Sequence, residues 1–520
     1  MTMNEKNYIK NIKMKRAKFI TLFRKITLRI ALMMVFTLPL FTACKDKWED
    51  HNALKQSVLS VTLNNLIASN ASLSTFTGYL KQTGYDKILA SSKTFTVWAP
   101  DNDALNNLDA GIVNDSSKLA QFVKNHITYQ EYPTNLGGLS VKMKMLSGKC
   151  IQYSSGQTQI EGSAIDITKS NQYCLNGLLH VIKSPLLPKL NIWEYFTSLK
   201  DTSVSIQKNY IQTSLVDKVF DPNHSRQTGF NKYGQPIYDT VWMYRNQFLY
   251  YVNDVSNEDS VYTYFILKNN ASQGAYNKLL PYVKDTTQYA SIYMDFYAKW
   301  NVFKDMVVRG KYTKDNLPAA LTSTLGIVLP TANITIESQY EASNGMVYVV
   351  SGFDIPMANK IPTVIIEGEN YWTTYDNFFN ENRISLLGIR SRSWASGGRD
   401  LFIPGYSTGP NIPSFSVLYK AYLYSVPYQV YWRAVNDFQG VFSQKLAINA
   451  HSIGDITATT YLGDTLVRYK TILQNNFSEV LLGQFTKQTY GIISLFVAAN
   501  TTPTNNPIVL DYLKLVPVLQ

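Results

Sequence analysis

A short segment that occurs twice constrains the fold of this chain more than any other feature. Residues 176–182 read Asn-Gly-Leu-Leu-His-Val-Ile, and residues 344–350 read Asn-Gly-Met-Val-Tyr-Val-Val, 168 positions later (344 minus 176). An Asn-Gly pair tolerates positive φ, the apolar run after it suits a buried strand, and a proline then ends the strand. The middle of the chain is therefore predicted to be one module used twice.

The same spacing recurs upstream of each copy. Residues 96–102 read Thr-Val-Trp-Ala-Pro-Asp-Asn, and residues 264–270 read Tyr-Phe-Ile-Leu-Lys-Asn-Asn. Each pattern predicts an apolar strand followed by a polar turn that caps a helix. Residues 216–219 echo residues 85–88 at an offset of only 131, so the second copy is predicted to carry an insertion of 37 residues (168 minus 131) at about 221–261.

The first copy resembles the fasciclin domain. The resemblance rests on Thr-Val-Trp-Ala-Pro-Asp-Asn-Asp-Ala-Leu at 96–105, Phe-Val-Lys-Asn-His at 122–126, and the Asn-Gly strand through Pro188. It implies two α+β fasciclin modules, at 57–189 and 190–362. In the second copy Lys268 replaces a proline and Tyr348 a histidine. The family pattern also implies that His126 and His180 pack inside their module rather than bind a ligand.

The insertion is rich in aromatic side chains beside turn-forming residues. Two interpretations stay open: these aromatics form a surface for a partner, or a hairpin packs them on its own module. The aromatic positions are Tyr233, Tyr238, Trp242, Tyr244, Phe248, Tyr250 and Tyr251.

The N-terminal part predicts export and lipidation. Residues 1–43 combine a basic start with an apolar run at 30–41, too short for a resident transmembrane helix, and are predicted to be a signal peptide that starts at Met1 or Met14. Residues 40–44 (Leu-Phe-Thr-Ala-Cys) resemble a bacterial lipobox, which implies that Cys44 is lipidated and that residues 44–56 form the tether. The charged stretch after Cys44 resembles signals that send lipoproteins to the outer face of an outer membrane.

The net charge of +12 does not indicate a nucleic-acid partner. Residues 1–43 contain nine Lys and Arg and one acidic residue, so the remainder carries +4. This small excess, spread over a long chain, excludes the strongly basic surface that nucleic-acid binding requires.

From residue 363 to residue 520 the pattern changes to short alternating strands, which predict a β-sandwich. Residues 366–371 (Ile-Glu-Gly-Glu-Asn-Tyr) and 509–517 (Val-Leu-Asp-Tyr-Leu-Lys-Leu-Val-Pro) resemble the first and last strands of galactose-binding-like jelly rolls. That resemblance implies a structural Ca²⁺ held by Glu367, Glu369 and Asp511, the alternative being solvated edge carboxylates. No other cofactor is expected. Flat aromatic rings can stack on a sugar ring, and arginine can form hydrogen bonds with its hydroxyl groups. The candidate sugar-binding residues are therefore Trp372, Trp394, Tyr406 and Arg392.

No catalytic constellation is recognisable in the sequence. Gly405–Gly409 fits the G-x-S-x-G pattern, but prolines flank it where a nucleophile elbow needs a strand and a helix. The five histidines show no metal-ligand spacing. Cys150 and Cys174 either pair as a disulfide in an oxidising envelope or remain two buried thiols. We therefore expect a protein that is not an enzyme.

Together these features predict a lipoprotein of the outer-membrane surface: two fasciclin modules followed by a jelly roll. The resemblance implies a non-catalytic accessory subunit of a SusCD-like importer of glycans or peptides, with the transporter subunits as its partners. A stand-alone glycan-binding or adhesion lipoprotein is the alternative, and a glycan hydrolase is a third hypothesis.

Overall fold

The computed structural model describes residues 60–519 apart from 136–139, 155, 157, 376–386, 406–414, 439, 449–466 and 501–505. The chain divides into two compact units, Met1–Pro188 and Lys189–Gln520. The division falls where the first module was expected to end. Over the described ranges, no helix combines the length and the hydrophobicity needed to cross a bilayer. The predicted signal peptide, Cys44 and the tether lie outside these ranges.

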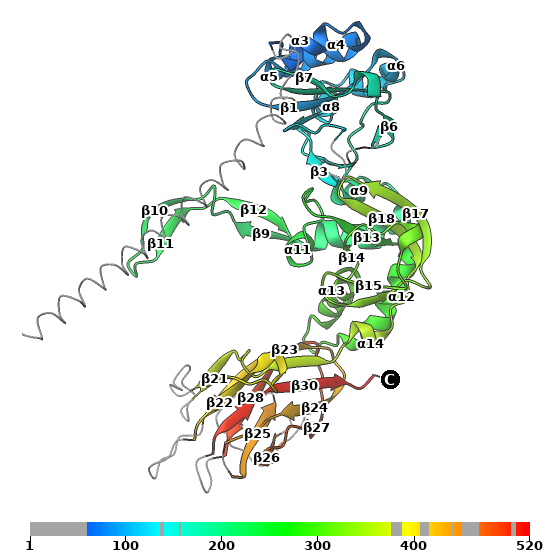
Figure 1. The fold of residues 1–520 in the computed structure, drawn as a ribbon. Helices are drawn as coiled ribbons and strands as arrows, with labels where there is room; N and C mark the ends of the chain where they lie inside the picture. The colour runs from blue at the N-terminus through cyan, green and yellow to red at the C-terminus, as the bar shows by residue number, and fades with distance from the viewer. Residues whose placement is uncertain are drawn as a thin grey trace, which may run out of the picture. The chain divides into compact units, whose positions relative to one another are not determined.

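A four-stranded sheet in the order β2-β1-β8-β7 forms the centre of the first unit (Figure 1). Its strands β1 (Phe95–Pro100) and β8 (Gly177–Ile182) are parallel and buried along their whole length, as their apolar runs predict. The flanking strands are β2 (Ile127–Tyr129) and β7 (Gln172–Cys174), and a hairpin of β3 (Ser140–Lys144) and β4 (Cys150–Ser154) lies apart from this sheet. The helices are α3 (Leu63–Ala68), α4 (Ser74–Thr83), α5 (Tyr85–Leu89), α6 (Asn102–Leu105), α7 (Ala110–Val113) and α8 (Ser116–Lys124).

The Asn-Gly pair ties the sheet of the first unit to its helices. The Asn176 side chain accepts a hydrogen bond from the Leu63 backbone N–H (2.8 Å) and donates to two carbonyls, of Leu89 (2.8 Å) and Ser91 (2.7 Å). Gly177 has φ +146°, and a Cβ there would lie 1.9 Å from the Phe95 carbonyl oxygen. The position of Asn176 therefore requires an amide side chain, and that of Gly177 requires glycine, because β1 and β8 approach each other so closely there.

The second unit begins with a module of the same topology. Its sheet has the order β14-β13-β18-β17, and β13 (Tyr262–Leu267) pairs parallel to β18 (Gly345–Gly352). Asn344 accepts from the Ile192 N–H (2.9 Å) and donates to the carbonyls of Val255 (2.8 Å) and Asn257 (3.1 Å), as Asn176 does in the first unit. The other elements are β14 (Val307–Arg309), β15 (Ala320–Thr322), β16 (Val328–Pro330), β17 (Thr335–Ala342), α9 (Ile192–Ser198), α10 (Ser205–Asn209), α11 (Gln247–Tyr251), α12 (Asn269–Leu279), α13 (Ala290–Phe303) and α14 (Met357–Lys360).

The upstream strand repeats at 167 residues, and the predicted offset of 168 is wrong by one. Phe95 stands opposite Gly177, and Tyr262 stands opposite Gly345 (262 minus 95 is 167). The side-chain hydrogen bonds support the offset of 167 residues. The Thr96 hydroxyl accepts from the Tyr132 N–H (3.0 Å), and the Thr263 hydroxyl accepts from the Tyr312 N–H (3.0 Å). A one-residue shift moves every side chain to the other face of a strand, so the register decides the equivalence.

The insertion is an arm of two antiparallel ribbons, residues 216–246. Its base is β9 (Val216–Phe220) paired with β12 (Trp242–Asn246), and its outer part is β10 (Arg226–Phe230) paired with β11 (Pro236–Asp239). The echo between residues 85–88 and 216–219 is wrong, because the former lie in helix α5 and the latter in strand β9. The predicted bounds of 221–261 are also shifted, since residues 247–255 return to the module and bury Phe248, Val252 and Val255.

Three antiparallel sheets form the C-terminal sandwich of the second unit. The expected strands are present, and β24 (Pro427–Arg433) alternates so that Tyr428, Val430 and Trp432 are buried. The sheet orders are β19-β30-β24-β27, β20-β23-β28-β25-β26 and β21-β22-β29. The remaining bounds are β19 (Val364–Glu367), β20 (Thr373–Tyr375), β21 (Gly388–Ser391), β22 (Arg399–Ile403), β23 (Ser416–Leu423), β25 (Phe442–Ile448), β26 (Val467–Ile472), β27 (Val480–Thr486), β28 (Gly491–Ala499), β29 (Ile508–Leu510) and β30 (Tyr512–Pro517).

Hydrogen bonds join the sandwich to the second module within this unit. Asn301 of α13 donates to the Tyr490 hydroxyl (2.7 Å) and accepts from the Tyr424 hydroxyl (2.7 Å). The Ser425 N–H donates to the Tyr282 carbonyl (2.9 Å). Because Asn301 is buried and satisfied by both tyrosines, these contacts stabilise the junction.

Candidate functional site

The most unusual surface of the described chain is the arm. Figure 1 shows its two ribbons extending away from the helices and the sheet of their own module. At the turn of the outer ribbon, Asn231 accepts from the N–H groups of Tyr233 and Gln235 (both 2.9 Å), and Gly234 takes φ +76°. This local turn chemistry fixes the hairpin without a core beneath it.

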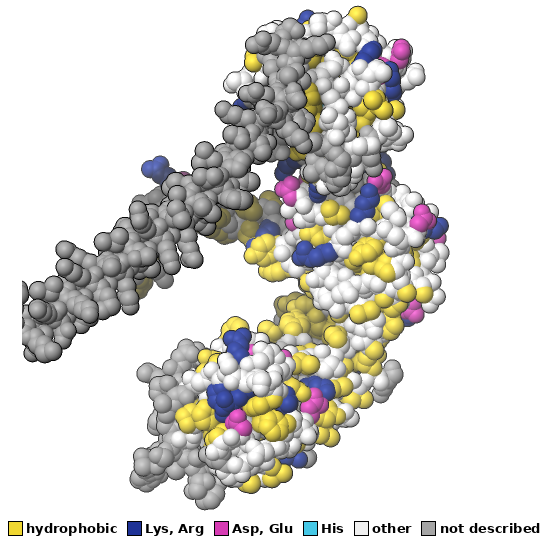
Figure 2. Space-filling view, in the orientation of Figure 1, with side chains coloured by type: hydrophobic (Ala, Val, Ile, Leu, Met, Phe, Trp, Pro, Cys, Tyr) yellow, Lys and Arg dark blue, Asp and Glu magenta, His cyan; other side chains and the backbone are white. Residues whose placement is uncertain are grey.

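One face of the arm is lined by aromatic rings. Trp242 stands opposite Phe220, and Tyr244 opposite Lys218, so alternation puts these four side chains on the same face. Tyr238 of the outer ribbon extends the row, with its ring 5.2 Å from that of Phe220. We call these five residues the aromatic face. In the space-filling view, hydrophobic side chains also gather where the arm meets α11 (Figure 2).

The opposite face attaches the arm to its module. Arg245 forms an ion pair with Asp217 (3.9 Å) and lies over the ring of Tyr250 at 4.1 Å from its centroid. Gln247 of α11 donates to the Asp217 carboxylate (2.6 Å). These contacts hold the base of the arm in place and leave the aromatic face open to solvent.

Four large rings of the arm are more than half exposed. Tyr244 is 75% exposed, Trp242 52%, Phe230 68% and Tyr233 74%. At about 150–250 Å² for each fully exposed ring, these four fractions amount to roughly 500 Å² of largely apolar surface, which is toward the upper end of the largest patch usual on a monomer. An isolated two-stranded ribbon is also only marginally stable in water. The arm is therefore a ribbon whose large rings have no core beneath them within its own module.

The arm has little net charge. Residues 216–246 contain four Lys and Arg and three Asp, a net charge of +1. His224 Nδ1 lies 2.6 Å from the Asp221 carboxylate, and this hydrogen bond holds the pKa of Asp221 below its usual value. An almost neutral aromatic surface fits a protein partner better than a phosphate-bearing one.

The three carboxylates predicted to hold Ca²⁺ lie at one end of the sandwich. Ser396 links two of them: its N–H donates to Asp511 (2.8 Å) and its hydroxyl donates to Glu367 (2.8 Å). Burial raises the pKa of Asp511 to about 6, although Arg433 lies 2.7 Å away and opposes the shift. Arg399 stands 3.5 Å from Glu369.

This acidic cluster partly fits a calcium ion. The second carboxylate oxygens of Glu367 and Glu369 are buried and accept no hydrogen bond from the described residues. Such hard, unsatisfied oxygens suit Ca²⁺, and these two side chains would hold it. No three His, Cys, Asp or Glu side chains of the described ranges converge as a metal site, however, and Arg433 already neutralises Asp511. The calcium site stays a prediction.

The predicted ligand residues have different surroundings. Trp372 is exposed, with the Lys420 ammonium 3.8 Å from its ring centroid. Trp394 is half-buried against Phe477, at 5.4 Å between ring centroids. Arg392 forms an ion pair with Asp437 through its Nε (2.9 Å), and its side chain is one-third exposed. Tyr406 lies outside the described residues.

The remaining predicted residues have structural surroundings. Cys150 lies in β4 and Cys174 in β7, and both are buried and not joined by a disulfide. Burial lowers the pKa of His126 and that of His180 to about 4. His126 accepts from the Leu186 N–H (2.9 Å), and the His180 ring stacks on Trp98 at 4.2 Å. Both histidines therefore have packing roles.

Sequence reasoning missed the partners that neutralise these groups. Arg433 reaches Asp511 from β24, and Ser396 lies in the loop before β22. Alternation along β24 predicts that Arg433 and Trp432 face opposite sides, but no local signal places Arg433 beside a residue 78 positions away.

Comparison with known proteins identifies the first unit. A model of the Fasciclin domain matches residues 71–188. The pig transforming growth factor-beta-induced protein ig-h3 (Sus scrofa) is 22% identical over 134 residues, which cover 25% of this chain and 20% of that protein. This chain thus spans about a fifth of the length of that relative. Residues 71–188 form a fasciclin domain, as the sequence motifs predicted.

Two solved structures resemble larger parts of the chain. A FAS1 domain pair from the insect cell adhesion molecule Fasciclin I covers 56% of this chain and 100% of its own, at 13% identity and a TM-score of 0.23. A carbohydrate-binding module CBM36 in complex with calcium and xylotriose covers 29% and 98%, at 13% identity and a TM-score of 0.20. The described chain is a fasciclin domain at residues 71–188 followed by a largely β-rich remainder, and a fasciclin domain suggests a non-catalytic adhesion or binding role.

Proposed function

We propose that this protein is a non-catalytic lipoprotein of the outer-membrane surface, anchored through Cys44, and an accessory subunit of a SusCD-like nutrient importer. In this proposal residues 190–362 are a second fasciclin module, and the arm that it carries docks on another subunit of the complex. The observation that carries the docking role is the exposed aromatic face of a nearly neutral ribbon.

The aromatic face has the composition of an interface hot spot. Trp and Tyr are enriched where binding energy concentrates, and Trp242 and Tyr244 lie side by side at the centre of the base ribbon. Burying both rings in a partner would contribute about 2–4 kcal/mol each, which corresponds to roughly 30-fold to 1,000-fold in the dissociation constant.

Purification from native membranes in mild detergent tests the proposal. We expect the wild-type chain to recover the importer subunits, and the double variant Trp242→Ser/Tyr244→Ser to lose them. Tyr289→Ser/Ile292→Ser is the matched control, because these side chains are also exposed apolar residues of the second unit but lie far along the chain from the arm. Recovery of the wild-type protein alone would refute the importer role.

The anchor is tested separately. Cys44→Ser removes the lipidated sulfur, and we expect that variant to leave the membrane fraction while keeping its fold. A Cys44→Ser protein that still sediments with the membrane would contradict lipid anchoring.

A stand-alone glycan-binding role is favoured by one observation, the exposed ring of Trp372 beside Lys420. A flat ring with a neighbouring ammonium group suits stacking against a sugar and bonding to its hydroxyls. Retention on immobilised polysaccharides that is lost in Trp372→Ala, with the arm variant unaffected, would favour this function over the importer.

A further inference from the structure

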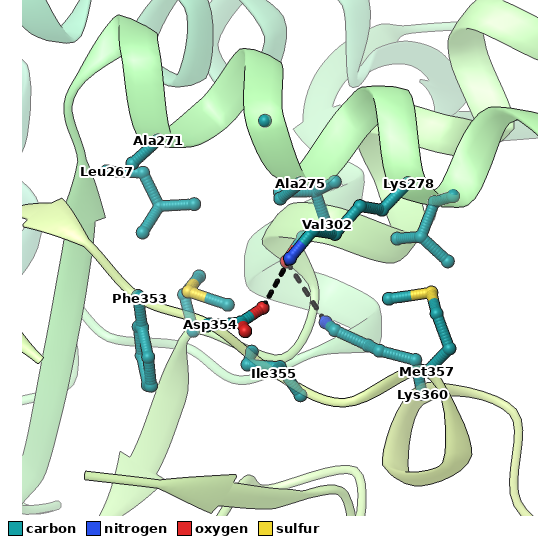
Figure 3. A pocket seen from close by; sticks show the side chains of 13 residues that line it. Leu267, Ala271, Ala275, Lys278, Val302, Phe353, Asp354, Ile355, Met357 and Lys360 are labelled. Carbon is teal, nitrogen blue, oxygen red and sulfur yellow. Dashed lines mark hydrogen bonds and ion pairs between the residues drawn. The ribbon is translucent and has the colours of Figure 1, made fainter. Parts of the chain in front are cut away.

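A small apolar pocket lies in the second module, away from the arm and from the sandwich carboxylates. It has a volume of about 180 Å³ and is bounded by α12, the end of α13 and the segment 353–360 (Figure 3). Its walls are mainly aliphatic and sulfur-containing side chains: Leu267, Ala275, Val302, Met306, Ile355 and Met357. A cavity of about 150 Å³ with such walls takes up one benzene molecule, so this pocket has room for one branched or aromatic group, or for a chain of about six to eight carbons.

The pocket is hollow because α12 carries small residues where it faces the segment 353–360. Ala271, Gly274 and Ala275 line it, and a Cβ built on Gly274 would meet no atom within 4 Å. Gly274 lies inside an α-helix, where alanine would be more favourable. Helix α12 therefore leaves a space that a larger side chain at position 274 would have filled.

Charged groups at the rim and wall give the pocket a positive excess. Lys278 reaches across the mouth to Asp354 (2.6 Å), and both side chains are more than half exposed. On the wall, the Lys360 ammonium is buried and bonds Asp305 (2.7 Å), which also pairs with Lys304 (2.9 Å). Asp305 and Lys304 lie behind the wall and do not line the pocket, so the lining itself carries the ammonium groups of Lys278 and Lys360 against the single carboxylate of Asp354.

We propose that this pocket binds a small apolar carboxylate: the hydrocarbon part fills the cavity, and the carboxylate pairs with Lys278 at the mouth. The exposed Lys278–Asp354 pair contributes little to stability, so Lys278 can exchange its partner readily. Two ammonium groups against one carboxylate in the lining favour an anion over a cationic head group. The same chemistry is found in a fatty acid and in the C-terminal residue of a peptide.

Calorimetric titration of the full-length protein tests the proposal with octanoate, N-acetyl-phenylalanine, octanol and octylamine. We expect saturable binding of at least one carboxylate, with a dissociation constant of about 1 mM or below, and much weaker binding of octylamine. Tighter binding of octanoate assigns an acyl chain, and tighter binding of N-acetyl-phenylalanine assigns a peptide end. Absence of saturable binding by both carboxylates overturns the proposal.

Three variants and one control locate the ligand. Gly274→Leu fills the cavity and is expected to weaken carboxylate binding at least tenfold. Gly78→Leu, at an exposed glycine of α4 whose Cβ also meets no atom, is expected to change nothing. Lys278→Met is expected to remove the preference for octanoate over octanol, and Asp354→Asn to strengthen octanoate binding several-fold. Carboxylate binding that is unchanged in Gly274→Leu, or equal binding of octanoate and octanol by the wild type, overturns the proposal.

Discussion

Replacing Asn344 by alanine removes the side chain that joins three segments of the second module. The amide donates to the carbonyls of Val255 (2.8 Å) and Asn257 (3.1 Å), and its oxygen accepts from the Ile192 N–H (2.9 Å). Asn344 is fully buried. The substitution therefore leaves two buried backbone groups, the Ile192 N–H and the Val255 carbonyl, without their partner, and removes one of two hydrogen bonds to the partly buried Asn257 carbonyl.

The cost follows from the number of groups left unsatisfied. Each buried donor or acceptor without a partner costs about 1–3 kcal/mol, and water that enters the space of the lost amide brings each cost toward the lower end. We expect Asn344→Ala to lower the free energy of unfolding of the second unit by about 3 kcal/mol. This is a factor of roughly 150 in its unfolding equilibrium constant.

Urea denaturation followed by tryptophan fluorescence measures this loss. Asn176→Ala is expected to lower the stability of the first unit by a similar amount, because it also has three such bonds. Asn359→Ala is the control, since its amide makes a single exposed bond to the Val328 carbonyl (2.9 Å). If Asn344→Ala shifts the denaturation midpoint no further than Asn359→Ala, the role assigned to the repeated asparagine is wrong.

Three further predictions concern the two units separately. Gly177→Ala places a Cβ 1.9 Å from a backbone oxygen, so we expect it to destabilise the first unit by roughly 3 kcal/mol or more, measured by calorimetry. The pKa of His126 and that of His180 are about 4 in the folded chain, against an ordinary value of 6.5 for a solvated histidine. Between pH 6.5 and pH 4 the unfolded chain therefore binds more protons than the folded chain does. The free energy of unfolding of the first unit is expected to fall as the pH drops through this range, by on the order of 3 kcal/mol per histidine. Melting curves across that pH range check this, and a flat profile contradicts it. Excess Ca²⁺ is expected to stabilise the second unit and so to raise its melting temperature. At a Ca²⁺ concentration one hundred times the dissociation constant, the free energy of unfolding should increase by about 2.7 kcal/mol. The double variant Glu367→Gln/Glu369→Gln should abolish this increase.

Local signals predicted the parts of the fold that depend on local chemistry. The Asn-Gly strand was predictable because a turn residue, an apolar run and a proline follow one another in the chain. The register between β1 and β8 was not predictable from local signals, because each strand pairs with a segment about 80 residues away in the sequence. This is why the second copy of the upstream strand was placed one residue out of register.

The surfaces were harder to predict than the core. Alternating aromatic residues in the insertion indicated strands. Periodicity does not show whether one face of a strand packs against the rest of the module or is exposed to solvent. The exposure of Trp242 therefore became visible only in the structure. Arg392 illustrates the same limit, since its partner Asp437 comes from a distant part of the sandwich. The pocket beside Lys278 combines α12 with a segment some 80 residues later, and no motif marks either part.

The arm leaves and re-enters its module at one place, since Val216 and Asn246 are paired directly across the base of the ribbon. None of its exposed rings contributes to the core of the second unit. The exposed rings can therefore be substituted without removing a core side chain, and if the arm has the docking role that we propose, a different hairpin grafted between these two positions would change the partner while the module keeps its core.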